Sequence, residues 1–311
     1  MAKITISGFY DEVDGSLDKQ IALLKELGET YMCPRTIDGK NISAYTVEEF
    51  AEKIKPRLDA NGIKFSSIGS PIGKVGLKDE TGFEKQKNQL KELIKIAQLM
   101  DCKYIRIFSF FVDSKGDFAE YKPIVFKKLK EFIDIAEDSG VVLLHENEKG
   151  IYGAKADKCL EIAKEFYGKN FALAFDSSNF VQCDDRPLEA YKLLKEYVKY
   201  IHVKDCSKYK VEVPLGMGEG DYKEIFTDLV EQGFEGFATM EPHTLKYALL
   251  KKPFYALPFV SLIPPLKHYR KVFRSIDKAY GKKAFQTVTR KEVFLWQYEN
   301  LTKLLKEVGA R

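Results

Sequence analysis

Eight short apolar runs alternate with segments of helical periodicity over the first 241 residues of this 311-residue chain. The runs are KITIS, ETYMC, IKFSSI, KYIRIF, VVLLHE, FALAF, YIHVK and GFATME. Each is too short for a helix, and parallel strands need a crossover helix between them. Eight such units in about 240 residues have the size of a closed (β/α)₈ barrel. We therefore predict an α/β TIM barrel. The alternative, a doubly wound open sheet, would not gather the ends of the last four strands around one point.

Apolar residues at helical spacing occupy the segments between these runs. Leu17, Ile21 and Leu24 mark one helix face, and a helix over 46–62 opens with the capping pair Thr46 and Glu49. Further helices are predicted around 90–97, 129–140, 160–163, 191–194 and 225–233. The segment 289–309 has the spacing of an eighth barrel helix.

Residues 245–285 exceed what the barrel needs. We predict that they form an insertion within a single TIM-barrel domain that spans residues 1–311. The insertion contains the apolar run FYALPFVSLIPPL, interrupted by prolines, and then the basic sequence KHYRKVFR. Three interpretations stay open, namely a packed extra loop, a lid over the barrel mouth, and a docking surface for a partner chain.

Ligand-type side chains stand at the ends of the last four apolar runs. They are Glu146, Asp176, His202 and Glu241. A closed parallel barrel brings such residues together at one mouth, and strand alternation places Asp176 on the same face as two small alanines. One such carboxylate alone would more often cap a helix or pair with a lysine. Four on consecutive strands instead favour a site for a divalent cation.

The chemistry of this donor set predicts a reaction next to a carbonyl group. A metal held by three carboxylates would polarise a substrate carbonyl and stabilise an enediolate. A neighbouring carboxylate could remove the proton from the adjacent carbon. Because Glu146 and Glu241 approach from strands five and eight, they could lie on opposite faces of one carbon. Two bases on opposite faces give epimerisation, whereas one base that returns the proton to the neighbouring carbon gives aldose–ketose isomerisation.

Composition excludes several other classes of function. The net charge of +4 comes from interleaved Lys and acidic residues, which gives little support for nucleic-acid or membrane binding. No apolar run approaches the length of a transmembrane helix, and the N-terminus lacks the pattern of a secretory signal. The five cysteines lack CxxC spacing, so we expect reduced thiols in a cytoplasmic protein.

Two further patterns are weaker. The glycine-rich segment Gly216–Gly220 could cradle a phosphate. It lacks the Walker and dinucleotide fingerprints, so we favour a turn that carries the chain into the next helix. Lys204 shares its strand face with His202 and could contact a substrate, whereas Arg106 is expected to be solvated or ion-paired.

At the four ligand positions the chain resembles the sugar phosphate isomerase/epimerase family with the xylose-isomerase-like barrel. The resemblance covers roughly residues 6–243 and rests on HENEKGIYG, FDSSNFVQ, YIHVKD, LGMGEGDY and MEPH. It implies one divalent metal held by Glu146, Asp176, His202 and Glu241, with the two glutamates also acting as the acid/base pair. Mn²⁺ is the favoured ion, and Mg²⁺, Co²⁺, Zn²⁺ and Fe²⁺ are the alternatives.

The chain departs from the family pattern at two positions. Asn179 stands where many sugar epimerases have a histidine that touches the substrate, and Cys33 stands where many relatives have a glutamate. Strand alternation also points one of the candidate histidines, His145, away from the metal ligands. With that reservation, substrate contacts are predicted for five residues: Lys204, Asn179, His145, His243 and Arg35.

These observations predict a cytoplasmic, divalent-metal-dependent isomerase or epimerase that acts on a sugar or polyol derivative by proton abstraction alpha to a carbonyl. A dehydratase or lyase is an alternative, acting on a keto-sugar, an inosose or an oxidised (C-)glycoside with a partner subunit bound through 245–285. A non-catalytic sugar-binding barrel is the other alternative. We expect no nucleic-acid or membrane partner, and a homo-oligomer is compatible with the extra apolar segment.

Overall fold

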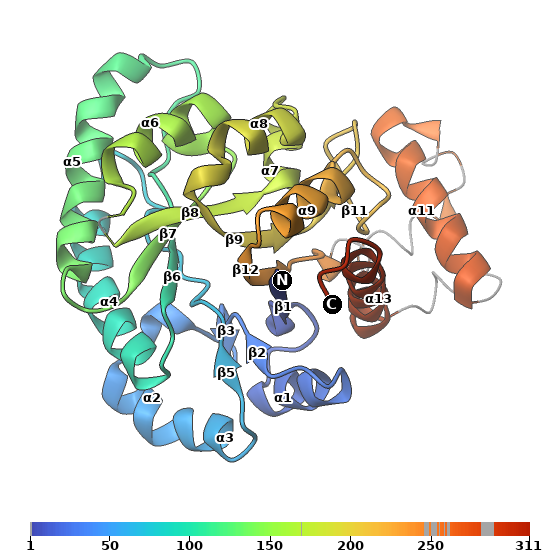
Figure 1. Cartoon of the computed structure of the whole chain (residues 1–311), viewed down its shortest axis with the longest axis horizontal. Helices are drawn as coiled ribbons and strands as arrows, with labels where there is room; N and C mark the ends of the chain where they lie inside the picture. The colour runs from blue at the N-terminus through green and yellow to red at the C-terminus, as the bar shows by residue number, and fades with distance from the viewer. Residues whose placement is uncertain are drawn as a thin grey trace.

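A curled parallel sheet forms the centre of the molecule (Figure 1). The computed structural model describes residues 2–168, 170–245, 262–280 and 289–311, together with 249, 254, 256, 257 and 259. Six strands pair in parallel in the order β1, β12, β9, β8, β7 and β6. Their bounds are β1 (Lys3–Gly8), β12 (Glu235–Met240), β9 (Val198–Val203), β8 (Phe171–Asp176), β7 (Val142–Glu146) and β6 (Tyr104–Ile107).

Two short strands complete the ring between β1 and β6. β2 (Tyr31–Met32) and β5 (Lys64–Phe65) pair in parallel with each other. The Cys33 amide donates a hydrogen bond of 3.0 Å to the carbonyl of Gly8, which joins β2 to β1. The amide of Arg106 donates one of 2.9 Å to the carbonyl of Ile68, which joins the end of β5 to β6. All eight predicted strands are therefore present in barrel order, and the predicted TIM barrel is confirmed.

Helices surround the sheet on its outer side (Figure 1). The barrel helices are α1 (Leu17–Glu26), α2 (Val47–Lys53), α3 (Lys55–Asp59), α4 (Glu80–Leu99), α5 (Phe118–Ala136), α6 (Ala156–Phe166), α8 (Pro187–Leu194), α9 (Tyr222–Glu231) and α13 (Arg290–Glu307). A short helix, α7 (Ser177–Gln182), follows β8 directly. The cap predicted at Thr46 is present, since its side chain accepts the Glu49 amide at 3.2 Å. Residues 289–309 do form the last barrel helix, which a capping box opens at Thr289.

Small hairpins and single-turn helices fill the connections. The hairpins pair β3 (Thr36–Ile37) with β4 (Lys40–Asn41) and β10 (Asp205–Cys206) with β11 (Glu212–Val213). The 3₁₀ turns cover Tyr10–Glu12, Ile42–Ala44, Tyr152–Ala154 and Lys195–Tyr197. The β10–β11 hairpin follows β9 and so lies at the carboxyl end of the barrel.

The interior of the barrel is packed by side chains that share one strand face. Leu144, Ala172, Ala174 and Tyr200 form a buried cluster there. Because side chains on a strand alternate between faces, Asp176 at the end of β8 points inward with the two alanines. The predicted strand alternation is thus correct for β8.

The segment after β12 carries an additional helix, α11 (Pro264–Tyr280). Its Tyr269, Val272 and Phe273 pack with Val213 of β11 and Val293 of α13, so α11 lies beside these elements at the edge of the barrel (Figure 1). Much of the predicted insertion, at 246–248, 250–253, 255, 258, 260, 261 and 281–288, lies outside the described residues. Its role as a lid or docking surface therefore stays a prediction.

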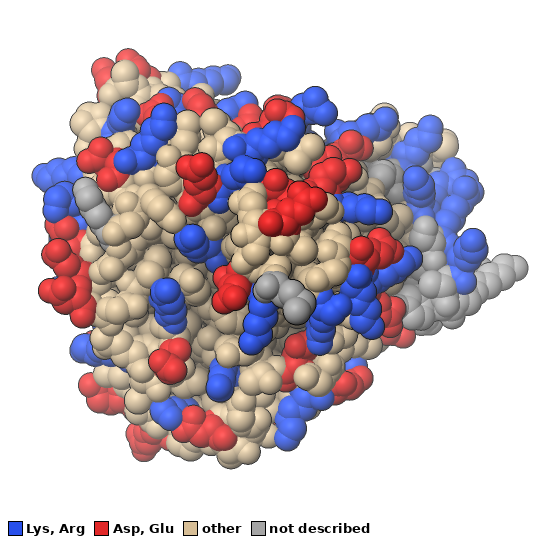
Figure 2. All heavy atoms as spheres, in the orientation of Figure 1, with Lys and Arg blue, Asp and Glu red and all other residues tan. Residues whose placement is uncertain are grey.

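Charged side chains of both signs are interspersed over the face of the molecule that Figure 2 shows. A basic stripe on α11 is the exception, with Lys267, Arg270, Lys271, Arg274 and Lys278 lining one groove. All five cysteines are free thiols, as predicted. Within the described part of the chain no helix is long and apolar enough to cross a membrane.

The glycine-rich segment Gly216–Gly220 wraps around a carboxylate of the protein itself. Asp205 Oδ2 accepts the amides of Gly216 and Gly218 at 3.0 and 2.9 Å. Its Oδ1 accepts the amides of Gly220 and Cys206 at 3.0 and 2.8 Å. The amides that could have cradled a phosphate already bind this carboxylate, so the interpretation as a turn is the one that the geometry favours.

Candidate metal centre

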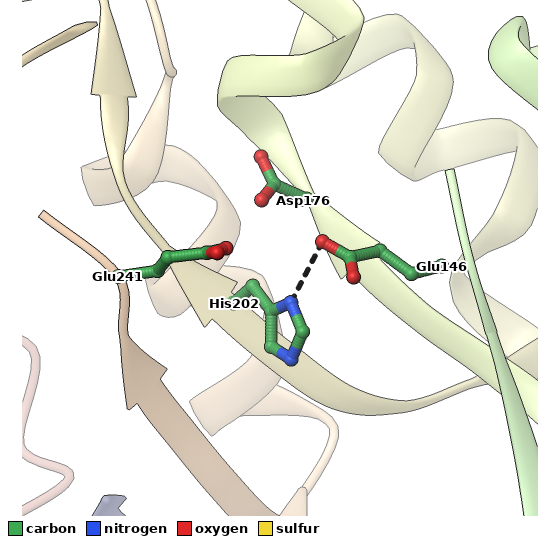
Figure 3. Close-up of side chains that lie close together, drawn as sticks. All are labelled: Glu146, Asp176, His202 and Glu241. Atoms are coloured by element: carbon green, nitrogen blue, oxygen red, sulfur yellow. Dashed lines mark hydrogen bonds and ion pairs between the residues drawn. The ribbon is translucent and has the colours of Figure 1, made fainter. Parts of the chain in front are cut away.

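The four ligand-type residues converge at the carboxyl end of the barrel (Figure 3). Glu146, Asp176, His202 and Glu241 each offer one ligand atom, and these atoms lie within 4.8 Å of one another. Each side chain is buried, with an exposed fraction of 5% or less. His202 Nδ1 lies 2.8 Å from Glu146 Oε1. The expected convergence is therefore present in the structure.

Strand register explains why these residues meet. Asp176 is paired with His202 across β8 and β9, and Glu146 is paired with Ala174 across β7 and β8. Glu241 directly follows β12, where its amide donates a 3.0 Å hydrogen bond to the carbonyl of Val203. Ends of adjacent parallel strands lie side by side, so successive strands deliver their last residues to one mouth.

Asp176 has two tasks, because its oxygens face different partners. Its Oδ1 accepts the amide of Asn179 at 2.9 Å and so caps α7. Its Oδ2 is buried and accepts no hydrogen bond of ordinary geometry among the described residues. A carboxylate at a strand end often does no more than cap the next helix, and here only one oxygen of Asp176 has that role. The other oxygen, Oδ2, faces the remaining ligand-type residues.

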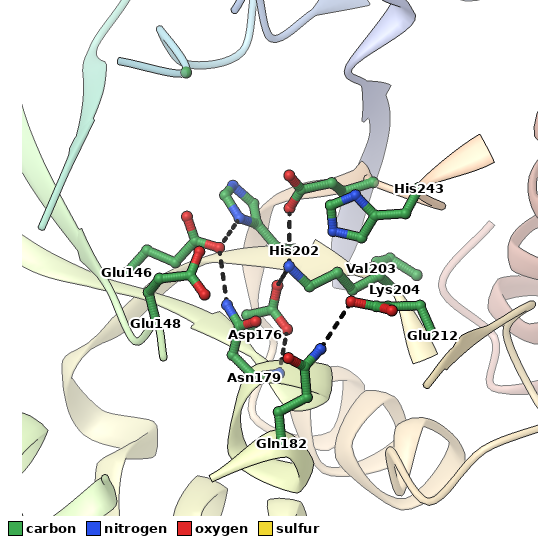
Figure 4. A network of polar contacts seen from close by, with 12 residues as sticks. Glu146, Glu148, Asp176, Asn179, Gln182, His202, Val203, Lys204, Glu212 and His243 are labelled. Carbon is green, nitrogen blue, oxygen red and sulfur yellow. Dashed lines mark hydrogen bonds and ion pairs between the residues drawn. The ribbon is translucent and has the colours of Figure 1, made fainter. Parts of the chain in front are cut away.

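Positive side chains lie directly against the carboxylates (Figure 4). Arg106 Nη1 is 3.1 Å from Glu146 Oε2. Lys204 Nζ lies 3.2 Å from Asp176 Oδ2 and 3.3 Å from Glu241 Oε2. Burial raises the pKa of Asp176 well above its ordinary value, and Lys204 offsets this only in part. Although burial also acts against ionised Glu241, Lys204 and other neighbouring cations hold its pKa well below the ordinary value.

Glu146 is also held in its ionised form. Burial opposes its charge, but His202 and Arg106 lower the pKa of Glu146 to about 2. Arg106 is itself fixed by backbone carbonyls, since its Nη2 donates to Gly69 at 3.2 Å and its Nε to Ser70 at 3.4 Å. The centre therefore contains two carboxylates, Glu146 and Glu241, that neighbouring cations hold in the ionised form.

A second group of ligand-type residues, Glu12, Glu241 and His243, shares Glu241 with the first. The guanidinium of Arg35 lies among them, 3.0 Å from Glu241 Oε1 and 3.7 Å from Glu12 Oε1. Asp11 anchors that guanidinium through a 2.9 Å contact to its Nε. Burial raises the pKa of Glu12 to about 8 despite the neighbouring Arg35. Because the guanidinium of Arg35 bridges Glu12 and Glu241, and the raised pKa disfavours the ionised form of Glu12, this group of three fits a metal less well than the first group of four.

The first group fits a single divalent cation. Three carboxylates and one imidazole are donor types that Mn²⁺, Zn²⁺ and related ions accept in proteins. Asp176 Oδ2 is a buried acceptor that has the ammonium of Lys204 as an ion partner but accepts no hydrogen bond of ordinary geometry among the described residues, and a cation would complete it. Four buried ligand side chains on four strands would also leave coordination positions for a substrate or water.

The structure places four of the five predicted substrate-binding residues at this centre. Lys204 and Arg35 contact the carboxylates directly, as given above. Asn179 Nδ2 is 3.5 Å from Glu146 Oε1, and His243 Nδ1 is 3.7 Å from Glu12 Oε1. The fifth, His145, lies elsewhere. It is fully buried on the other face of β7, where its Nε2 is 2.9 Å from Ser109 Oγ.

Sequence reasoning missed two residues that shape the centre, Asn147 and Glu12, and did not identify the partner of a third, Arg106. Arg106 was expected to be solvated or ion-paired, and it is ion-paired, as a buried partner of Glu146. A charged residue within the apolar run KYIRIF was the available signal. Asn147 exchanges hydrogen bonds with the Asp176 backbone at 2.9 and 3.0 Å. Glu12, in the 3₁₀ turn after β1, has no local pattern that would have identified it.

Comparison with known proteins gives a family and a fold. The model of the family described as xylose isomerase-like TIM barrel matches residues 21–271. An uncharacterized protein of Methanocaldococcus jannaschii is 28% identical over 134 residues, which are 41% of this chain and 45% of that protein. The uncharacterized protein YihM of Escherichia coli is 23% identical over 179 residues, 55% of this chain and 52% of that protein. The chain thus spans about half the length of these curated relatives.

Solved structures share the fold at low sequence identity. A xylose isomerase domain protein from Planctomyces limnophilus has a TM-score of 0.66 and 19% identity, with 100% of this chain and 99% of that chain covered. The IolI protein with a bound zinc atom has a TM-score of 0.70 and 16% identity, with 98% and 99% covered. The probable 3-DHS dehydratase AsbF from Bacillus anthracis has a TM-score of 0.62 and 14% identity, with 78% and 93% covered.

Proposed function

The chain belongs to the xylose isomerase-like TIM barrel family, and we propose that it is a divalent-metal-dependent sugar isomerase or epimerase. The observation that carries the proposal is the buried group of three carboxylates and one imidazole at the barrel mouth. Active sites of TIM-barrel enzymes lie at this end of the strands. The proposed reaction removes a proton from the carbon next to a substrate carbonyl.

Glu146, Asp176, His202 and Glu241 would hold the cation, one ligand atom from each. A cation held there would polarise the substrate carbonyl and offset the negative charge that develops on proton removal. Mn²⁺ remains the favoured ion of this proposal. The zinc atom in the structure of IolI supports a divalent ion in a barrel of this fold.

Glu146 and Glu241 are the proposed acid/base pair. Both have a pKa below the ordinary value, so both are held in the ionised form that a general base requires before it takes a proton. They approach the centre from β7 and from the end of β12, with Asp176 and His202 between them along the ring of strands. That separation supports attack on a substrate carbon from two sides. Epimerisation would use both residues, and isomerisation would need one.

The substrate in this proposal is a sugar or polyol derivative. Its hydroxyl and carbonyl oxygens need hydrogen-bond donors, and the mouth supplies the ammonium of Lys204, the guanidinium of Arg35 and the amide of Asn179. His243, which lies beside Glu12, extends the polar lining away from the metal ligands. These are four of the predicted substrate-binding residues.

Metal content and one glutamine substitution test the proposal together. We expect about one equivalent of a divalent ion per chain, and a higher melting temperature when Mn²⁺ is added to metal-free protein. Incubation of ketoses in D₂O should place deuterium on the carbon next to the carbonyl. Glu241→Gln should abolish this exchange while retaining the fold by circular dichroism, because an amide cannot accept the proton.

Glu131→Gln is the matched control for that substitution. Glu131 Oε2 forms a 2.9 Å ion pair with Lys87 on the outside of the barrel, so its loss should leave exchange unchanged. Full exchange in Glu241→Gln would remove Glu241 from the mechanism. No bound metal and no exchange in the wild-type protein, after reconstitution with each candidate ion, would leave the non-catalytic sugar-binding barrel as the better description.

Elimination is the second candidate function. It begins with the same proton abstraction and then expels a leaving group, as in a dehydratase or lyase acting on a keto-sugar, an inosose or an oxidised glycoside. The fold shared with a probable dehydratase supports it. Exposed apolar side chains beyond β12, including Leu249, Phe259 and Leu262 at 67%, 63% and 68% exposure, support a partner subunit at 245–285. An alkene product or a released aglycone would identify this reaction.

A further inference from the structure

The ammonium group of Lys204 lies between two of the four metal-ligand candidates. Its Nζ is 3.2 Å from Asp176 Oδ2 and 3.3 Å from Glu241 Oε2, and the side chain is only 4% exposed. Figure 4 shows the contact of Lys204 with Asp176 as a dashed line. Lys204 follows His202 by two residues and so points to the same side of the barrel wall. A positive charge thus already occupies part of the space that a bound cation would use.

Lys204 is held less firmly than the other cations of the mouth. Arg106 also donates to two backbone carbonyls, and Arg35 is anchored by Asp11. For Lys204 Nζ, the contacts found among the described residues are those to Asp176 and Glu241 alone. Both are longer than the roughly 2.7–2.9 Å of a good charge-assisted hydrogen bond. Within the described part of the chain, no ion pair or hydrogen bond from outside the four ligand candidates holds this ammonium.

Electrostatics explains why an ammonium is favourable at this position. Asp176 and Glu241 are buried carboxylates whose ligand atoms lie within 4.8 Å of those of Glu146. Buried charges without a partner are strongly unfavourable, so the pair needs a counter-ion. A divalent cation would need the same carboxylate oxygens and would repel an ammonium at that distance. Metal and ammonium cannot both be bound fully by these two residues.

We propose that Lys204 is an internal counter-ion that competes with the divalent metal for Asp176 and Glu241. It stabilises the metal-free barrel and weakens metal binding, and metal uptake releases its ammonium for an oxygen of the substrate. The inference rests on the metal site of the proposed function. It adds to that function a coupling between metal binding and substrate binding, because the metal releases the lysine that contacts the substrate.

Lys204→Met tests the competition without any need for substrate. Its metal-free form should melt at a lower temperature than the wild type, because two buried carboxylates lose their counter-ion. Calorimetric titration with Mn²⁺ should give a Kd at least about tenfold lower than that of the wild type, or about 1.4 kcal/mol. The rise in melting temperature on saturation with Mn²⁺ should also exceed that of the wild type.

Lys128→Met is the matched control. Lys128 is another buried lysine, and its Nζ binds the carbonyl of Leu77 at 2.8 Å and Glu80 Oε1 at 2.8 Å, on the outer side of the barrel. Its loss should lower the melting temperature without changing the Mn²⁺ Kd. Lys204→Gln, which is neutral but can still donate to Glu241, is the second variant if Lys204→Met does not fold, and it should change the Kd in the same direction.

The outcomes separate this inference from the proposed function. An unchanged or higher Mn²⁺ Kd in both Lys204 variants would overturn the competition while the metal site stood. Metal binding by the variants but not by the wild type would support the competition in its strongest form. Absence of binding in all three proteins, with Zn²⁺ and Co²⁺ as well as Mn²⁺, would overturn the metal site and the competition with it.

Discussion

Asp205 is predicted to hold the loop Gly216–Gly220 in place through its carboxylate. Its two oxygens accept four backbone amides, from Cys206, Gly216, Gly218 and Gly220, at 2.8 to 3.0 Å. The side chain is 2% exposed, so water cannot easily replace it. The perturbation that tests this arrangement is Asp205→Asn, which keeps the shape of the side chain and changes one acceptor oxygen into a donor.

The geometry gives the size of the effect. An amide side chain has one acceptor oxygen, so two of the four backbone N–H groups must then face an NH₂ group. Leaving a buried donor without an acceptor costs about 1–3 kcal/mol, and the two together cost about 2–6 kcal/mol. The lower part of that range applies if the amide oxygen stays with Cys206 and Gly220, because Gly216 and Gly218 are nearer to solvent.

Urea unfolding followed by far-UV circular dichroism would measure the loss. Glu219→Gln is the control, since Glu219 is an exposed carboxylate in the same loop, and it should change the free energy of unfolding by no more than about 0.5 kcal/mol. If Asp205→Asn were as stable as the control, the carboxylate would not organise the loop. A role for the glycine amides in binding a phosphate would then have to be reconsidered, and inorganic phosphate should stabilise the protein.

Two further predictions concern the outer surface of the barrel. Although burial opposes its charge, contacts with Lys158, Lys122 and Tyr152 lower the pKa of Glu161 from 4.5 to about 2. A lowered carboxyl pKa adds stability above pH 4.5 that is lost as the pH falls towards 2. Because solvent screens these partly exposed ion pairs, Glu161→Gln should lower the free energy of unfolding by only about 0.5–1.5 kcal/mol at neutral pH. This difference from the wild type in urea unfolding should shrink as the pH falls from 4.5 towards 2. Cys183 is the one cysteine of the five that is not buried, so a thiol reagent should modify it before the others in the native protein. Burial raises the pKa of Cys183 to about 11, so the reaction should be slow. Mass spectrometry of the labelled protein would measure both the order and the rate.

The order of elements in the barrel could be predicted from the sequence because it depends on local patterns. Eight apolar runs and the helices between them are set by hydrophobic periodicity, which each segment carries in itself. The lengths of β2 and β5 could not be predicted. Only two residues of each form a regular strand, because one hydrogen bond joins β2 to β1 and an isolated bridge at Ile68, beyond the end of β5, makes the connection to β6.

The convergence of Glu146, Asp176, His202 and Glu241 was also predictable, because strand alternation and barrel closure bring strand ends together. The positions of the basic side chains that pair with these carboxylates were predictable only in part. Lys204 follows from alternation in YIHVKD, since it shares a face with His202. The contact of Arg35 with Glu241 joins residues 206 positions apart, and that of Arg106 with Glu146 depends on the spacing of β6 and β7. Such long-range pairs arise from the closed ring, and no local pattern specifies them.

Asn179 cannot act as an acid or base in the proposed reaction. Many sugar epimerases have a histidine at this position, which could exchange protons with a substrate, whereas an amide side chain does not titrate. Asn179 Nδ2 instead donates a hydrogen bond of 2.8 Å to the carbonyl of Asn147 and lies 3.5 Å from Glu146 Oε1. It is therefore suited to positioning Glu146 and a substrate oxygen. Proton transfer in the proposed reaction then falls to the ionised carboxylates Glu146 and Glu241, which is why one glutamine substitution can test so much of the mechanism.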